Sequence, residues 1–349
     1  MTPAVVSLWA GFVIGLAFGV TGQRTGFCLN TGIRTFLIAG DGKKLRAFAL
    51  ALAVAILGSQ AADAAGFVDL NQSIYLGAGL SWFLLPLGGL LFGYGMVAAN
   101  GCGARALVLM GQGNLRSFVV LICLGIAAHM TLTGLLAPLR TSVATLTGAT
   151  FAAGASVPGA LLASAGTEAV ARLAPALVLG GALLWFSFSS AAFRASRPDV
   201  LGGLIIGALI PASWIATGWL GADDFEPVPL AALTFVAPIG DTIQYAMLAT
   251  GSRVNFGVAV VCGVFLGALG ASLLTGSFHL EGFKEPGRQV RSMIGGALMG
   301  VGGALALGCS IGQGLSGLST LAFGSFLAAG GIVLGATLGL RGPLKLPAL

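Results

Sequence analysis

Charged residues are scarce in this sequence, and their scarcity decides the class of protein. Asp, Glu, Lys and Arg make up 8% of the 349 residues, whereas soluble domains contain about 25%. The hydrophobic fraction is 56% and the mean hydropathy is +0.98. A soluble fold of this size could not bury so much apolar surface, so lipid must be the solvent. We therefore predict an all-α polytopic membrane protein.

Enzyme and cofactor motifs are also missing. The chain has no HExxH zinc motif, no phosphate-binding P-loop and no Cys-x-x-Cys pair. Gly-x-Gly patterns carry no information in a chain with 57 glycines. The formal charge of +6 comes from basic residues scattered at segment ends. We therefore expect no enzymatic activity, cofactor, metal or nucleic-acid partner. Residues 1–4 lack the basic region of a signal peptide, so we expect the first apolar run to be retained.

Apolar runs of about 20 residues, the length that crosses a bilayer as a helix, recur along the chain. They predict nine transmembrane helices, at residues 3–22, 47–65, 76–99, 117–136, 169–190, 200–220, 254–278, 290–308 and 321–340. Four segments, 24–40, 100–115, 231–250 and 309–320, are too short or too broken by Gly and Pro to span. We interpret them as short re-entrant helices, which membranes tolerate only where protein or a water-filled cavity surrounds them.

Loop charges predict the orientation. The basic clusters are Lys43, Lys44 and Arg46; Arg194 and Arg197; Lys284, Arg288 and Arg291; and Arg341 and Lys345. One loop, with Asp223, Asp224 and Glu226, is strongly acidic. If the N-terminus is outside and each broken segment returns to the side it left, all basic clusters fall inside and the acidic loop outside. This is the arrangement that the positive-inside rule favours.

The predicted topology contains an internal symmetry. Residues 1–136 form a first repeat, 137–199 a connector with the fifth span, and 200–349 a second, inverted repeat. Asn100-Gly101-Cys102-Gly103-Ala104 is echoed by Leu307-Gly308-Cys309-Ser310-Ile311. Inverted repeats with broken helices are typical of transporters. The alternative is a chance likeness between glycine-rich helices.

Cysteine is infrequent, and its positions are informative. There are five, an odd number, all in or beside apolar segments, so a disulfide framework is not expected. Cys123 and Cys262 lie inside ordinary spans, where we expect small apolar fillers. Cys28, Cys102 and Cys309 lie in the glycine-rich breaks. A short helix beginning after each would point N–H groups and its positive dipole end at the sulfur, which makes an anion site with a thiol in it. Chance placement of small residues at turns is the alternative.

Three segments carry a resemblance: Arg24-Thr25-Gly26-Phe27-Cys28, Gly101-Cys102-Gly103-Ala104-Arg105 and Gly308-Cys309-Ser310-Ile311-Gly312-Gln313-Gly314-Leu315-Ser316-Gly317. They resemble the signature segments of the YeeE/YedE family of sulfur-transport membrane proteins, and the similarity covers nearly the whole chain. It implies uptake of thiosulfate, or a related sulfur or selenium species, through the bacterial inner membrane. It also implies that the three motif cysteines line the route and that a small cytoplasmic sulfur-carrier protein is a possible partner. Gln313 stands where many members have His, which leaves a protonatable role there in doubt.

Further polar residues complete the candidate site. Arg24, Arg34 and Arg105 could draw an anion inward, or could simply anchor helix ends. Asn100, Gln112 and Gln313 could donate amide N–H groups, or could cap the short helices. His129, Asp63 and Asp241 lie in apolar surroundings and are candidates for proton coupling. The predicted substrate path comprises Cys28, Cys102, Cys309, Arg105, Arg24, Asn100, Gln313 and Ser310.

Our functional hypothesis is an inner-membrane permease in which a small sulfur anion passes from Cys309 through Cys102 to Cys28. Burying an unpaired charge costs tens of kcal/mol in the idealised limit, so each stop must supply hydrogen-bond donors. A thiol adds a weak donor and a polarizable surface suited to a terminal sulfur. The rivals are a membrane thiol enzyme that forms a persulfide, a selenium transporter, a channel for another small solute, and a structural scaffold.

Overall fold

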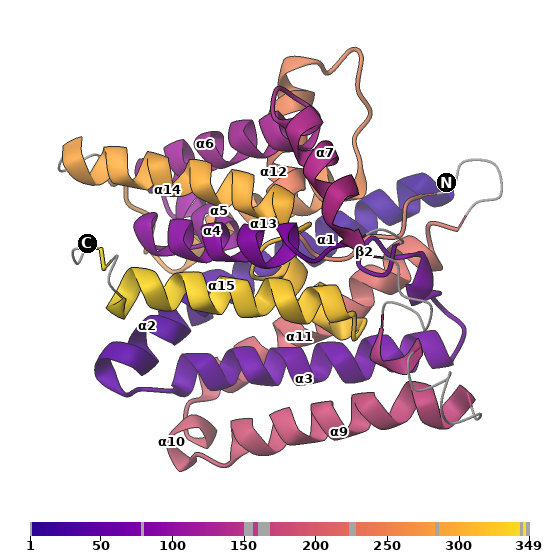
Figure 1. The fold of residues 1–349 in the computed structure, drawn as a ribbon. Helices are drawn as coiled ribbons and strands as arrows, with labels where there is room; N and C mark the ends of the chain where they lie inside the picture. The colour runs from indigo at the N-terminus through magenta and orange to yellow at the C-terminus, as the bar shows by residue number, and fades with distance from the viewer. Residues whose placement is uncertain are drawn as a thin grey trace.

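A computed structural model describes residues 2–77, 80–149, 156–159, 168–222, 228–282, 286–342 and 345–346. These residues are almost entirely helical (Figure 1). The strands among them are β1 (Leu80–Ser81) and β2 (Gly148–Ala149), which pair antiparallel. Seven helical stretches are long and apolar enough to cross a membrane, and Leu173–Phe188 is a shorter apolar helix. The prediction of an all-α polytopic membrane protein is confirmed.

Nine long helices in the described ranges correspond one to one with the nine predicted spans. They are α1 (Pro3–Thr25), α3 (Lys43–Ala64), α4 (Leu84–Ala98), α6 (Leu115–Leu132), α9 (Glu168–Phe188), α11 (Arg197–Gly218), α13 (Phe256–Leu274), α14 (Pro286–Leu305) and α15 (Phe323–Arg341). The third starts later than the predicted residue 76, because β1 occupies part of the predicted span; the 3-10 turn η1 (Leu70–Gln72) lies before it.

Short helices occupy the four segments that were too broken to span. These are α2 (Leu29–Ala39), α5 (Gly103–Gly111), α12 (Val236–Met247) and the π-helical turn η2 (Gly312–Gly317). Two further short helices, α7 (Ala137–Thr147) and α10 (Ala191–Arg194), flank the fifth long helix in the connector. The pattern of apolar runs therefore identified every long helix and every break in the described residues.

The long helices pack mainly against partners from the opposite half of the chain. The most extensive contacts join α1 with α13, α3 with α11, α4 with α15, α6 with α14, and α4 with α14. If α1 is matched to α11, α3 to α13, α4 to α14 and α6 to α15, every pair maps onto another pair or onto itself. The short helices obey the same exchange, since α2 packs on α3 and α15 while α12 packs on α13 and α6. This symmetry supports the predicted repeats 1–136 and 200–349, whose boundaries stay a prediction.

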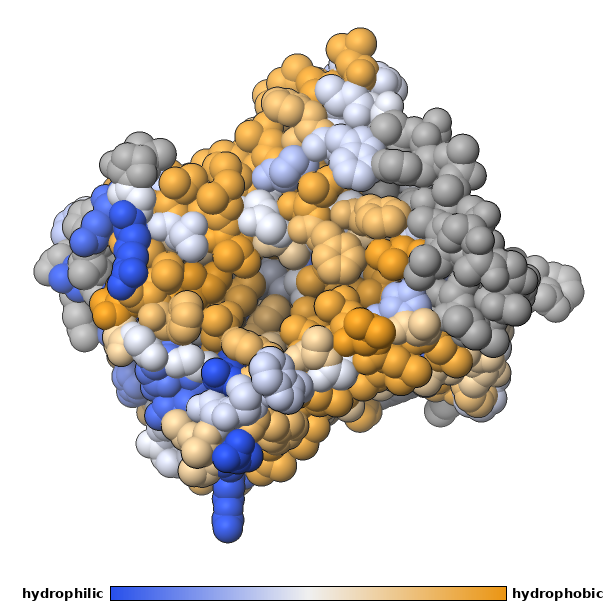
Figure 2. Space-filling model, turned by 60° about the horizontal axis from the view of Figure 1, so that its bottom comes forward, coloured by the Kyte–Doolittle hydropathy of each residue, from blue (hydrophilic) through white to orange (hydrophobic). Residues whose placement is uncertain are grey.

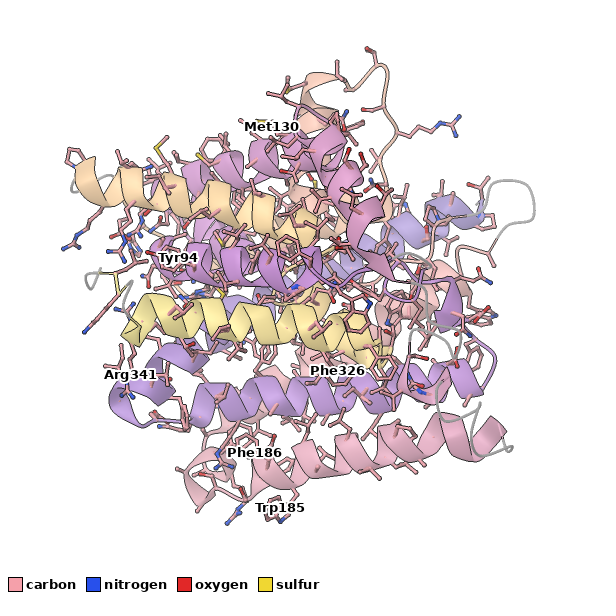
Figure 3. All side chains as sticks on the ribbon, viewed as in Figure 1. Tyr94, Met130, Trp185, Phe186, Phe326 and Arg341 are labelled. Carbon is pink, nitrogen blue, oxygen red and sulfur yellow. The ribbon has the colours of Figure 1, made fainter. Side chains whose placement is uncertain are left out.

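The two ends of the helix bundle differ in charge. The two termini lie at opposite ends (Figure 1). The start of α3, the turn α10 and the start of α14, all with basic residues, lie at the same end as the C-terminus, as does Arg341 (Figure 3). Figure 2 shows hydrophilic residues gathered towards one end of a mostly apolar surface. The acidic loop at 223–226 and Lys284 lie outside the described residues.

Apolar side chains also cover the outside of the bundle. Trp185 on α9 is 76% exposed and points away from the other helices (Figure 3). Trp9 on α1 is 60% exposed. Large exposed apolar surfaces of this kind are the side that a transmembrane helix turns to lipid.

Glycine allows the helices to approach within backbone contact. A Cβ built on Gly93 of α4 would lie 2.0 Å from the Ile332 carbonyl oxygen of α15. One built on Gly331 of α15 would lie 2.5 Å from the Pro86 carbonyl oxygen. No side chain fits at these distances, so the glycines set the spacing of the two helices, as small residues do in membrane interfaces.

Adjacent glycines of α15 provide a test of this packing. Gly331→Ala should lower the apparent melting temperature of the detergent-purified protein, because overpacking costs about 1–3 kcal/mol. Gly330→Ala is the matched control, since a Cβ at that position meets nothing within 4 Å. Equal melting temperatures for the two variants would show that the helix spacing is not fixed by Gly331.

Candidate functional site

The three cysteines of the breaks lie at the starts of short helices. Cys28 is the N-cap of α2, Cys102 is the N-cap of α5, and Cys309 precedes η2 by three residues. Their exposed fractions are 5%, 2% and 1%. Cys123 is half-buried and Cys262 is exposed, in keeping with their interpretation as fillers within spans. The expectation that a short helical segment follows each of the three cysteines is confirmed.

Two residues before each of these cysteines, the backbone adopts the left-handed conformation. The φ angles are 62° at Gly26, 61° at Asn100 and 56° at Leu307. In the last two breaks the next residue is glycine, whose N–H bonds to the carbonyl five residues back: Gly101 to Met96 at 2.9 Å and Gly308 to Gly303 at 2.8 Å. This is the Schellman pattern, which ends a helix and satisfies its last carbonyls. The echoed sequences around Cys102 and Cys309 are thus the same backbone turn used twice.

The breaks meet in the core, which brings the three sulfurs into one cluster. The Cys28 and Cys102 thiols lie within hydrogen-bonding reach of each other. The Ser310 hydroxyl lies beside Cys102, and Cys309 is near enough to act on Cys102 electrostatically. Thr31, one turn into α2, faces Cys28 with its N–H and its hydroxyl. The cluster is assembled from segments about 70 and 200 residues apart in the chain.

Donors without formal charge surround Cys309. The Gly312 N–H donates to Cys309 Sγ at 3.3 Å. The N–H groups of Ile311 and Phe235 and the hydroxyl of Thr234 also interact with this sulfur. Unpaired N–H groups at the start of a helical turn form a ready anion site. The arrangement can therefore stabilise a negative charge beside the thiol without burying a cation.

Two cavities approach the cluster from opposite ends of the bundle. One, of about 520 Å³, lies between the start of α1, α12 and the start of α13, and reaches Thr234. The other, of about 430 Å³, lies at the basic end and is lined by Thr31, Asn100 and Arg105 together with Arg116 and Arg288. We call them the N-terminal cavity and the basic cavity. The thiols separate the two, since Thr234 touches Cys309 and Thr31 touches Cys28.

The predicted arginines and Asn100 divide between the site and its surroundings. Arg105 lines the basic cavity, lies in electrostatic range of Cys28 and donates to the Gly22 carbonyl at 3.4 Å. Asn100 lines the same cavity and accepts a hydrogen bond from Arg34 at 2.8 Å. Arg24 is exposed on the last turn of α1, and no described contact joins it to the thiols.

Polar residues of the third break are all buried. Gln313 donates through Nε2 to the Ala306 carbonyl, which ties η2 to the end of α14. Its Oε1 and the Ser310 hydroxyl have no hydrogen-bond partner among the described residues. Ser310 directs its hydroxyl at the Cys102 thiol, whereas Gln313 is in part a structural cap.

Of the three candidates for proton coupling, His129 and Asp241 lie together and Asp63 lies elsewhere. His129 Nε2 on α6 is 3.2 Å from Asp241 Oδ1 on α12, and Asn255 donates to the other carboxylate oxygen at 2.9 Å. Asp241 lines the N-terminal cavity. Asp63 accepts a hydrogen bond from the Leu70 N–H at 2.9 Å and so caps a loop. Asp241 and His129 are thus near the candidate path, and Asp63 is not.

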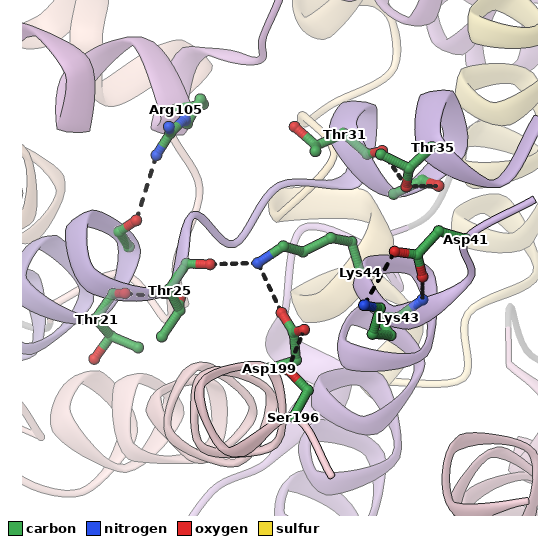
Figure 4. Close-up of polar contacts among 12 residues, drawn as sticks. Thr21, Thr25, Thr31, Thr35, Asp41, Lys43, Lys44, Arg105, Ser196 and Asp199 are labelled. Carbon is green, nitrogen blue, oxygen red and sulfur yellow. Dashed lines mark hydrogen bonds and ion pairs between the residues drawn. The ribbon is translucent and has the colours of Figure 1, made fainter. Parts of the chain in front are cut away.

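A partly buried ion pair, which the sequence did not reveal, anchors the first break. Lys44 Nζ lies 2.7 Å from Asp199 Oδ1 and also donates to the Thr25 carbonyl (Figure 4). The Ser196 hydroxyl donates to the other Asp199 oxygen at 2.7 Å. The cation therefore caps the C-terminal end of α1, where the helix dipole favours positive charge. Loop charge alone marked Lys44 as a topology signal, because its partner is 155 residues away in the sequence.

Substitution of two neighbouring lysines, one at a time, compares the stabilising effect of a partly buried ion pair with that of an exposed one. Lys44→Met should destabilise the protein by about 2–3 kcal/mol, because it leaves the buried Asp199 carboxylate without a cation. Lys43→Met removes only an exposed pair with Asp41, worth less than about 1 kcal/mol. Thermal unfolding in detergent measures both. Similar melting temperatures for the two variants would contradict a structural role for the Lys44–Asp199 pair.

Comparisons with known proteins identify the family of this chain. A family described as sulphur transport matches residues 24–338. A protein of Spirochaeta thermophila named thiosulfate transporter TsuA is 27% identical over 341 residues, covering 94% of this chain and 96% of that protein. A protein of the same name from Escherichia coli K12 is 23% identical over 326 residues, covering 88% and 86%. With this match across most of its length, and with relatives that are transporters rather than enzymes, the chain belongs to the sulphur-transport (YeeE/YedE) family of membrane proteins, as its three cysteine-bearing segments predicted.

Proposed function

We propose that this protein is a permease that carries thiosulfate across the bacterial inner membrane into the cytoplasm. The observation that supports it most directly is the cluster of three buried thiols between two cavities at opposite ends of the bundle. The relatives named as thiosulfate transporters support the choice of substrate. A selenium oxyanion has similar chemistry and is the second candidate substrate.

The charge distribution suits the import of a dianion. A buried dianion needs donors at every stop, because an unpaired charge in a low-dielectric medium costs tens of kcal/mol in the idealised limit. N–H groups, hydroxyls and thiols supply those donors around Cys309 and Cys28 without holding the anion as tightly as a buried cation would. Three arginines, Arg105, Arg116 and Arg288, line the basic cavity, whereas the N-terminal cavity has one, Arg253, together with Asp241. The three arginines would draw the anion towards the basic end.

The order of stops follows from the contacts. The anion enters the N-terminal cavity and meets Thr234 and Cys309, passes Ser310 to reach Cys102 and Cys28, and leaves past Thr31 and Arg105 into the basic cavity. In this scheme the basic end is cytoplasmic and the N-terminus is outside, in accord with the positive-inside rule. A small sulfur-carrier protein would receive the anion at the basic end.

Uptake of radiolabelled thiosulfate by cells that lack their own thiosulfate transporters tests the proposal. Expression of this chain should restore uptake, and Cys28→Ala, Cys102→Ala and Cys309→Ala should each reduce it at least tenfold, since each removes a stop on the path. Cys123→Ser and Cys262→Ser are the matched controls and should transport like the wild type. No uptake by well-expressed wild-type protein would refute the assignment.

Serine at the same positions distinguishes two ways of using the thiols. A serine keeps a hydrogen-bond donor but cannot form a persulfide. If the thiols act only as donors, Cys309→Ser should keep a substantial share of the uptake that Cys309→Ala loses. Equal loss in both variants would favour a step in which the sulfur itself reacts.

A further inference from the structure

A buried tyrosine outside the three cysteine-bearing segments faces the Cys309 thiol. Tyr75 lies in the segment between α3 and α4, is 3% exposed, and packs its ring edge-on against Trp214 at 6.2 Å between centroids. Its hydroxyl interacts electrostatically with Cys309. Burial raises the pKa of Tyr75 above its ordinary range, so the hydroxyl keeps its proton and is a donor.

A second hydroxyl approaches the same point. A Cβ built on Gly312 would lie 2.6 Å from Thr234 Oγ1 and 3.6 Å from the Tyr75 hydroxyl oxygen. The Gly312 N–H is the group that donates to Cys309 Sγ. The two hydroxyls therefore converge beside the sulfur, over a residue whose side chain is absent. A methyl group at position 312 would press on Thr234 and fill the space between the hydroxyls.

This group of donors borders the N-terminal cavity through Thr234. Thr234 is half-buried and lines the N-terminal cavity, whereas Tyr75, Gly312 and Cys309 lie behind it in the core. A ligand arriving through the cavity would meet Thr234 first and could then accept a hydrogen bond from the Tyr75 hydroxyl. Two hydroxyls that converge beside one sulfur therefore suit a ligand that carries oxygens.

We propose that the Tyr75 and Thr234 hydroxyls form an oxyanion cradle that binds the oxygens of the substrate while its terminal sulfur faces Cys309. This inference rests on the proposed function and deepens it. The cradle requires oxygens at one end of the anion and a polarizable atom at the other. Sulfate lacks the terminal sulfur and sulfide lacks the oxygens, so both should compete poorly with thiosulfate for uptake.

Removal of single hydroxyls tests the cradle by thiosulfate uptake kinetics. Tyr75→Phe should raise the KM for thiosulfate about 10–100-fold, the value of a hydrogen bond to a charged group, with a smaller effect on the maximal rate. Thr234→Val should act in the same direction, and Thr234→Ser, which keeps the hydroxyl, should restore most of the affinity. Tyr245→Phe removes the same group from α12 outside both cavities and should leave the KM unchanged.

The outcomes separate this inference from the proposed function. If the wild type takes up thiosulfate and Tyr75→Phe has the wild-type KM, the cradle is refuted and the permease assignment stands. If the wild type takes up no thiosulfate, both fall. If Tyr75→Phe does not fold, the comparison of Thr234→Val with Thr234→Ser tests the cradle instead. Equal KM values for these two variants would also refute it.

Discussion

The whole structure depends on one constraint: a helix can end inside a membrane only where protein satisfies its last carbonyls and the first N–H groups of the next segment. This chain meets the constraint at each cysteine with a left-handed residue followed two positions later by the thiol. The turn satisfies the carbonyls of the preceding helix, and at Cys28 and Cys309 N–H groups of the following segment interact with the sulfur. The way the helices are broken therefore places hydrogen-bond donors beside these two thiols.

Glycine makes the arrangement possible in two ways. In the interfaces it brings backbones together, as at Gly93 against Ile332, so that the long helices form a tight frame around the breaks. In the breaks it removes side-chain cover, as at Gly312, where the hydroxyls of Thr234 and Tyr75 converge. A chain with the usual glycine content would lose either the frame or the space beside the sulfur.

Charged side chains lie at the margins of the thiol cluster. Lys44 and Asp199 neutralise each other where α1 ends, and the arginines near the thiols face the basic cavity rather than the Cys309 end. Arg253 and Asp241 line the N-terminal cavity, so each cavity has its own charged residues, whereas the donors in contact with Cys309 are neutral.

The sequence by itself determined the class, the long helices, the short broken segments and the three cysteines, because each leaves a local mark: an apolar run of bilayer length, an interruption by glycine, or a rare residue in that interruption. It also predicted the family. It could not identify Lys44 with Asp199, or Tyr75 and Thr234 with Cys309, since these residues carry no local pattern and their partners are far away in the chain. Only the tertiary structure decided which polar side chains reach the thiols and which, like Arg24, do not, because contact between breaks is set by the packing of the two halves against each other.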